Sequence, residues 1–275
     1  MKYTIKELPI FASSQTFQLN AMAIAPPGEK KPLIIFEDET FTYCHLLSKV
    51  ITNCLGESYS SMSIDEEPVR KHLDKHPEIE DKFGELLHVS ISKNSIVNVK
   101  PFPIFNLDMK MLLRIITDSM EKYLMGHELG HVIDGHLEIN TEMSAIGDHS
   151  NEINPDWDKE FIADRIGLEI AIEAQSKSGT HSNYHLIGAD TLMTFLHLQH
   201  VLKATIKGEK DLVYSLNSSH PPPMLRREKM REHYFNITGN QVGVNIAGNG
   251  SKILFELWDR IKEKVLTLNK GKESL

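Results

Sequence analysis

Hydrophobic and polar positions follow a helical repeat through much of the second half of the chain. From Asn106 onward, apolar side chains and two histidines recur at spacings of three and four residues, which places them on one face of a long helix. These positions are Leu113, Ile116, Met120, Leu124, His127 and His131. Asp108 is a suitable cap for this helix, and Gly135 is a suitable end. The pattern therefore predicts one long helix whose two histidines face the interior.

Further helices are predicted after this one. Asn154 and Pro155 are residue types favoured at a helix start, as the cap and the first helical position, and this helix should reach about Ala174. The others are expected over residues 185–206, from the prolines at 221–223 to about Tyr234, and over residues 251–268. The intervening residues 236–249 are rich in glycine and are expected to be loose.

The first hundred residues carry mixed patterns. Residues 32–36 form a short apolar run that predicts a strand, and residues 41–55 have helical spacing. Residues 88–99 alternate between apolar and polar side chains around Lys93 and Asn94, which favours a β-hairpin. A small sheet is therefore expected near the N-terminus.

The domain organisation follows from these patterns. Residues 1–105 are predicted to form a mixed α/β lobe with an edge hairpin, and residues 106–275 a helical region, the two together making one integrated domain. The fold class expected is α+β, with a predominantly helical C-terminal half and a small N-terminal sheet. A chain of 275 residues is long enough to bury a substantial core in this form.

Composition and charge narrow the classes of function. Hydrophobic residues make up 40% and charged residues 25% of the chain, which is ordinary for a globular protein. The formal net charge of -8 argues against a nucleic-acid partner, because such proteins usually present a basic face. No apolar stretch approaches the length of a membrane span, and residues 1–25 do not resemble a signal peptide. A cytoplasmic location is therefore expected.

The two cysteines are also consistent with a cytoplasmic location. Cys44 and Cys54 fall in one predicted helix, so a disulfide between them is not expected. Reduced structural thiols are typical of cytosolic proteins. A thiolate that caps a metal ion in a latent form is the alternative interpretation.

The pattern HExxH at His127, Glu128 and His131 carries the chemistry of the chain. Histidines four residues apart lie one helical turn apart on the same face, so both imidazoles can reach one metal ion. Glu128 is displaced by one residue, which places its carboxylate beside the metal as a general base. The small Gly130 allows another element to approach the helix. The alternative is a pair of interior histidines that are satisfied by hydrogen bonds alone.

A catalytic zinc site needs a third protein ligand and an open fourth position. A further histidine at the spacing used by one group of these enzymes is missing, because Leu137 occupies that position. Glu160 and Asp164, one turn apart on the next predicted helix, supply a carboxylate ligand and an acceptor for the outer N–H of a ligand histidine. The rival third ligands are Asp148, His149 and Asp158.

In these residues the chain resembles the gluzincin metallopeptidases. The most similar branch contains the prenyl-protein processing proteases and the bacterial heat-shock membrane proteases. Glu160 through Asp164, with alanine before the aspartate, match that branch, and so do His220, Pro221 and Arg226 at the spacing of its HPxxxxR element. The resemblance implies a zincin-like fold, with His220 stabilising the oxyanion and Arg226 buttressing the site.

The matching pieces cover about residues 112–231 of the chain, and no transmembrane helix accompanies them. A prenylated membrane substrate is therefore not expected. A looser resemblance is to the phage-exclusion HExxH peptidases of bacteria, which cut a host translation factor.

The sequence thus predicts an endopeptidase with one zinc ion, acting on a protein or peptide substrate. Water would be activated by Glu128, and the predicted hairpin at residues 88–99 would pair with an extended substrate. Two alternatives stay open: a metal-stabilised scaffold without activity that binds a protein partner, and a regulatory or host-defence peptidase with a single target.

Overall fold

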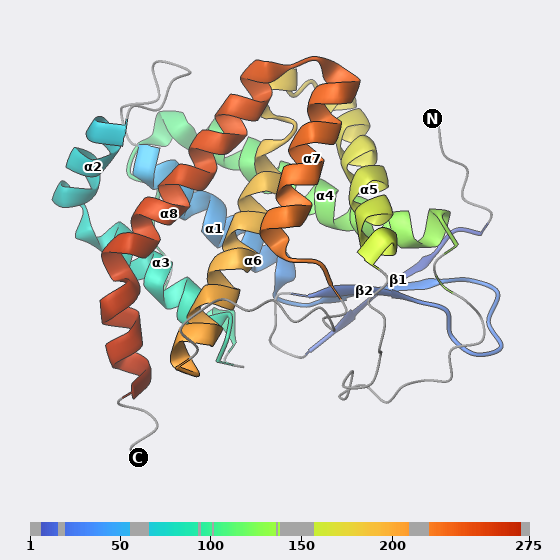
Figure 1. Ribbon diagram of the computed structural model, residues 1–275, viewed down its shortest axis with the longest axis horizontal. Coiled ribbons are helices and arrows are strands. Elements are labelled where there is room, and N and C mark those ends of the chain that lie inside the picture. The colour runs from blue at the N-terminus through green and yellow to red at the C-terminus, as the bar shows by residue number, and fades with distance from the viewer. Residues whose placement is uncertain are drawn as a thin grey trace.

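The computed structural model describes residues 7–15, 20–55, 66–92, 95–100, 102–135, 137, 157–208 and 220–270. Over these residues the protein is α+β and mostly helical, with one small sheet formed by N-terminal residues, as the sequence predicted. The sheet lies at one end of a helical body (Figure 1). The described helices are α1 (Thr40–Leu55), α2 (Glu66–Lys75), α3 (Pro77–Val89), α4 (Lys110–Ile133), α5 (Trp157–Lys177), α6 (Ile187–Ile206), α7 (Pro223–Thr238) and α8 (Gln241–Lys270).

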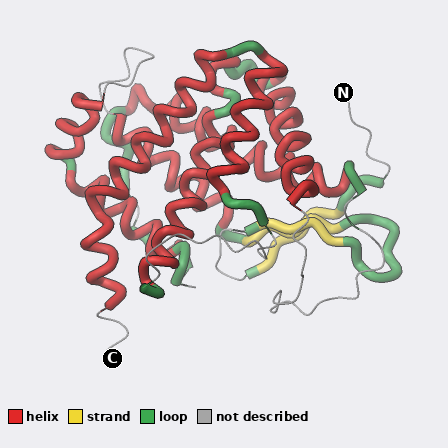
Figure 2. Tube along the Cα trace, viewed as in Figure 1, coloured by secondary structure: helices red, strands yellow, loops and turns green. Residues whose placement is uncertain are grey.

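The sheet has three described strands in the order β1-β3-β2. Figure 2 shows the strands in yellow. β1 (Ile10–Ser14) is parallel to β3 (Leu33–Glu37), and β2 (Ala21–Ile24) is antiparallel to it. The central strand is the apolar run that the sequence predicted. It buries Ile34 and Phe36, so one face of the sheet belongs to the interior.

One cluster of buried hydrophobic side chains joins the two halves of the chain. It draws residues from α1 and α3 as well as from α4, α6 and α8. Phe83 of α3, for example, packs edge-on against Phe195 of α6 at a ring separation of 6.3 Å. The N-terminal lobe and the helical region therefore share a core.

The predicted long helix is present as α4. The cap lies two residues earlier than expected. Asn106 accepts a hydrogen bond from the backbone N–H of Asp108 and caps a 3-10 turn at Leu107–Met109, which precedes α4. Gly135 adopts a left-handed conformation with φ of 72° just after the helix ends. Among the described helices, none combines the length and the apolar character that a bilayer crossing would require.

The hairpin predicted over residues 88–99 is wrong. α3 continues to Val89, and a 3-10 turn follows at Ile96–Asn98, while Lys93 and Asn94 lie outside the described residues. The backbone N–H of Ile96 is satisfied by the side chain of Glu39 at 2.6 Å rather than by a neighbouring strand. The alternation of the sequence arises because Val89 and Ile96 enter the helical core from the end of a helix and from a turn.

The loose segment predicted at residues 236–249 is also wrong. α7 continues to Thr238, Gly239 reverses the chain, and α8 begins at Gln241, ten residues before the expected start at Ser251. Gly243 lies inside α8, where an added Cβ would be 2.7 Å from the hydroxyl of Tyr234. This glycine therefore serves close packing of α7 on α8. The predicted start at Asn154 and Pro155 lies outside the described residues, and α5 is described from Trp157.

Candidate metal centre

The candidate metal centre lies where α4 crosses α5 at close range. At the crossing, Gly126 of α4 faces Gly167 of α5, and a Cβ on Gly126 would lie 2.6 Å from the carbonyl oxygen of Gly167. Only glycine allows two helix backbones to approach so closely. The crossing therefore brings side chains from consecutive turns of the two helices to a common point.

Three potential ligand atoms meet beside this crossing. His127 and His131 come from α4 and Glu160 from α5, and one ligand atom of each lies within 4.8 Å of the others. The two Nε2 atoms are 3.3 Å apart, and they lie 3.6 and 3.5 Å from the carboxylate oxygens of Glu160. Ligands bound at about 2.0–2.1 Å to one tetrahedral ion are themselves about 3.3 Å apart. The separations therefore suit a single metal ion.

The chemistry of the donor set also fits a cation. Although burial raises the pKa of Glu160, the charge of Arg226 and the nearby histidines hold that pKa below its ordinary value, so the carboxylate is ionised. Its Oε2 atom is buried and accepts no hydrogen bond, although Arg226 Nη1 forms an ion pair with it at 3.3 Å. A buried carboxylate oxygen without a hydrogen bond is costly unless a cation approaches it. Two imidazoles and one carboxylate form a ligand set that zinc commonly takes.

Asp164 holds the first histidine in a defined orientation. Its Oδ1 atom lies 3.0 Å from His127 Nδ1 and accepts a hydrogen bond from the Tyr123 hydroxyl at 2.5 Å. Arg226 donates to both carboxylate oxygens, at 2.8 Å through Nε and 2.6 Å through Nη2. Burial alone would raise the pKa of Asp164, but Arg226 and His127 hold it far below its ordinary value. An ionised Asp164 keeps the proton of His127 on Nδ1 and leaves Nε2 able to bind a metal.

Glu128 lies beside the three ligand residues without joining them. Its carboxylate is buried and lies near the backbone N–H of Ala23 on β2. Burial raises the pKa of Glu128 above its ordinary value and Glu160 adds to this rise, while His127 acts against it. A glutamate with a raised pKa is suited to general-base chemistry near neutral pH.

The structure also brings His220 and Arg226 to this centre. His220 precedes α7, and its Nε2 atom lies 3.6 Å from Glu160 Oε1 with 61% of the side chain exposed. Pro223 opens α7, which places Arg226 one turn inside the helix and within reach of Asp164. Of the rival third ligands, Asp158 is exposed on α5 outside the cluster of potential ligands, and Asp148 and His149 lie outside the described residues.

A pocket of about 300 Å³ opens onto this centre. His127, Glu128, His220 and Arg226 contribute to one part of its lining. Strand β2 contributes Ala21, and helix α6 contributes a third wall. The side chains of that wall are Leu192, Met193, Leu196 and His200.

Sequence reasoning missed several of these residues. The position of Tyr123 could have been predicted from the sequence, since it lies four residues before His127 and therefore on the same helix face. The positions of Ala23 and of the α6 side chains could not have been predicted, because their approach to the site depends on tertiary contacts. His200 of α6 also lines the pocket.

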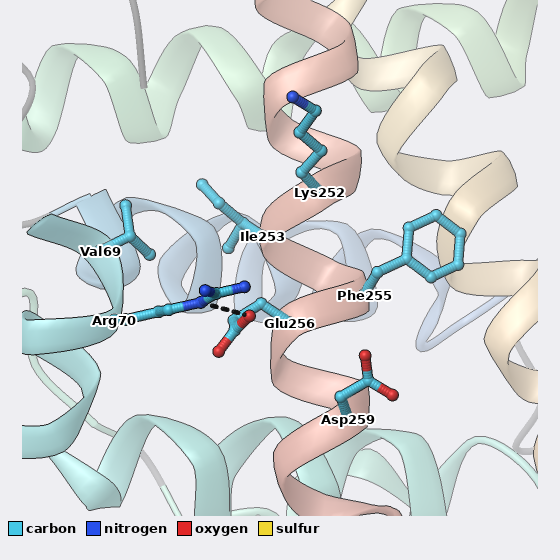
Figure 3. A pocket seen from close by; sticks show the side chains of 7 residues that line it. All are labelled: Val69, Arg70, Lys252, Ile253, Phe255, Glu256 and Asp259. Atoms are coloured by element: carbon cyan, nitrogen blue, oxygen red, sulfur yellow. Dashed lines mark hydrogen bonds and ion pairs between the residues drawn. The ribbon is translucent and has the colours of Figure 1, made fainter. Parts of the chain in front are cut away.

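A second pocket of about 230 Å³ lies away from the metal centre, between α2 and α8 (Figure 3). Its charged side chains include Arg70 and Glu256, which form an ion pair across it at 3.0 Å. Glu256 also receives a hydrogen bond from Arg260 at 2.8 Å. These contacts join α2 to α8. Among the described residues, no cluster of three or more potential metal ligands lies in this pocket.

No family model, curated protein or solved structure matches this chain. The resemblance to gluzincins therefore rests on the short motifs alone.

Proposed function

We propose that this protein is a zinc-dependent endopeptidase. The observation that carries the proposal is the convergence of His127, His131 and Glu160, with the Glu128 carboxylate buried beside them. Three protein ligands with space for a fourth are typical of catalytic zinc, whereas structural zinc usually has four protein ligands. The pocket next to the three ligands offers that space.

Bound zinc would supply a Lewis acid that polarises the scissile carbonyl and lowers the pKa of a water molecule. Glu128 takes a proton from the attacking water and afterwards delivers it to the leaving amine. The exposed imidazole of His220 projects into the pocket and donates a hydrogen bond to the developing oxyanion. Asp164 and Arg226 fix His127 throughout.

The sheet offers a substrate-binding edge that replaces the hairpin expected from the sequence. The backbone N–H of Glu37 donates to Asn20 O at 3.1 Å, so the carbonyl of Asn20 points toward β3. Because backbone groups alternate along a strand, the N–H groups of Ala21 and Ala23 point away from β3, and Ala21 lines the pocket. The proximity of the Ala23 backbone N–H to Glu128 agrees with this orientation. An extended peptide would add to the sheet at Ala21.

Metal content is the first test of the proposal. Purified without chelators, the protein is expected to contain close to one zinc per chain, and Glu160→Ala and His127→Ala should lower this content sharply. Elemental mass spectrometry measures both. A wild-type protein without zinc would refute the proposal.

The role of Glu128 has a separate test. Glu128→Gln should retain zinc near one equivalent and lose essentially all hydrolysis of an unfolded protein substrate, because glutamine cannot accept the proton of water. Retained hydrolysis in this variant would show that the proposed mechanism is wrong.

The substrate edge is tested with prolines at matched positions. Ala21→Pro removes an N–H that points away from β3 and leaves the β2–β3 hydrogen bonds intact, so peptide hydrolysis should fall while zinc content stays unchanged. Ser13→Pro is the control. Ile10 N–H and Ser14 O bond toward β3, so the N–H of Ser13 points away from β3 on the opposite edge of the same sheet. Equal hydrolysis by the two variants would exclude substrate pairing at β2.

A further inference from the structure

The α6 wall of the pocket is a continuous apolar surface. Leu192 and Leu196 lie one turn apart on α6 and both line the pocket, with Met193 beside them. Leu192 and Met193 are almost fully buried, while Leu196 is partly exposed. The pocket therefore has a polar side, at the candidate metal centre, and an apolar side formed by one helix.

The remaining boundaries of the apolar side are rigid or uncharged. Pro221 and Pro223 line the pocket before α7 and at its first turn, where their rings have little freedom to move. His200 extends the line of Leu192 and Leu196 by one further turn. Burial, and then the charge of Lys203, lower the pKa of His200 to about 4, so its imidazole is neutral at pH 7. The charge of Arg226 is already neutralised by Asp164.

The size and position of this space suit one side chain of a bound peptide. Successive side chains of an extended strand point to opposite faces of its sheet, so a peptide paired with β2 directs every second side chain to the same face. The whole pocket holds only about 300 Å³, at the lower end of the range of small-molecule sites, so the part beside the α6 wall suits a single side chain. A charged side chain would lose hydration against Leu192 and Leu196 without gaining a partner there.

We propose that the α6 wall of Leu192, Met193 and Leu196 is a specificity pocket for the substrate side chain next to the scissile bond, and that it selects uncharged, apolar residues of leucine or methionine size. This inference rests on the proposed function. It names the substrate class as protein segments with a large apolar residue beside the cleaved bond.

The test measures binding of simple zinc-chelating probes by isothermal titration calorimetry to the zinc-loaded protein. The probes are acetohydroxamate and the hydroxamates of acetyl-glycine, acetyl-leucine and acetyl-lysine, which differ only in the side chain beside the chelating group. The leucine probe is expected to bind at least about 10-fold more tightly than the glycine and lysine probes, as is usual for an apolar side chain in a fitted pocket.

Two substitutions of Leu196 change the size of the pocket in opposite directions. Leu196→Phe should reduce the preference for leucine over glycine to near unity by filling the space. Leu196→Ala should shift the preference toward the larger acetyl-phenylalanine hydroxamate. Thr205→Ala, at an exposed position near the end of the same helix, is the control and should keep the wild-type preference.

The possible outcomes separate the two proposals. A leucine preference that the Leu196 variants alter supports the specificity pocket. Equal binding of all probes, or a preference that neither Leu196 variant changes, overturns the specificity pocket and leaves the open zinc site standing. Failure of every probe to bind, acetohydroxamate included, would show that the zinc has no open position. Both the proposed function and the specificity pocket would then be wrong.

Discussion

The backbone of Ala163 lies in the space that a side chain on Gly130 would need. A Cβ on Gly130 would be 2.7 Å from the carbonyl oxygen of Ala163 and 2.8 Å from its Cα. The glycine within the HExxH motif therefore lets α5 approach the helix that carries both histidines. The close approach expected of Gly130 from the sequence is confirmed, and it places Glu160 next to His131.

Replacement of this glycine is expected to separate the two helices. Gly130→Ala should lower the free energy of unfolding by about 1–3 kcal/mol, because backbone atoms rather than a flexible side chain must move. It should also weaken zinc binding, measured by competition with a chelator, because Glu160 moves away from the histidines.

The matched control is another glycine in a helix. A Cβ on Gly248 of α8 would lie 3.6 Å from Arg231, which is ordinary contact. Gly248→Ala should therefore leave zinc affinity unchanged and stabilise the helix by up to about 1 kcal/mol. Similar zinc affinities in the two variants would contradict the role assigned to Gly130.

Asp164 is expected to set the affinity for the metal without binding it. Asp164→Asn removes the charge that orients His127 and neutralises Arg226, so zinc affinity should fall about 10- to 100-fold. The metal-free protein should lose at most about 3 kcal/mol of unfolding free energy, because Glu160 remains within 3.3 Å of Arg226. Chelator competition and urea denaturation measure these two quantities.

A partly exposed aspartate on α4 is the control for this substitution. Asp118 forms ion pairs with Arg114 and Lys122 at 3.8 and 3.9 Å on the surface. Asp118→Asn should change stability by less than about 1 kcal/mol and leave zinc affinity as it is. A loss of zinc affinity as large as that of Asp164→Asn would show that the effect is one of overall charge.

A second buried carboxylate is expected to anchor the helix that carries Arg226. Asp190 of α6 is fully buried, and it accepts hydrogen bonds from Arg231 of α7, through Nη2 at 2.8 Å, and from Ser251 of α8. Asp190→Asn should lower the free energy of unfolding by about 3 kcal/mol, because the cation of Arg231 loses its partner.

Urea denaturation of a double-mutant cycle checks this anchor. Arg231→Gln combined with Asp190→Asn should destabilise by less than the sum of the single changes, because both remove the same interaction. Simple additivity of the two losses would mean that Asp190 and Arg231 act independently.

The two thiols are expected to be inert in the folded protein. Cys44 and Cys54 are free and buried in the core, as predicted, and burial raises the pKa of both well above the usual range. A chromogenic disulfide reagent at pH 8 should react with neither until denaturant is added, and then with both. Rapid reaction of either thiol under native conditions would be inconsistent with this core and would restore the interpretation of a metal-capping cysteine.

The errors of the sequence predictions have a common physical cause. Residues 88–99 alternate as a strand would, but alternation also occurs where a helix end and a turn enter one core. Residues 236–249 are rich in glycine, yet Gly243 lies within α8, where glycine is suited because Tyr234 of the neighbouring helix leaves no space for a larger side chain. Local patterns report the burial of a position and leave open which partner buries it.

The sequence alone determined the features that depend on spacing along one helix. It placed His127, Glu128 and His131 on α4 and Glu160 and Asp164 on α5, because helical geometry is the same wherever a helix lies in a protein. Tertiary structure decided what meets these residues: β2 at Glu128, Arg226 at Asp164 and the α6 wall across the pocket. Such contacts join residues far apart in the chain, and they arise only when the helices and the sheet bury their apolar faces together.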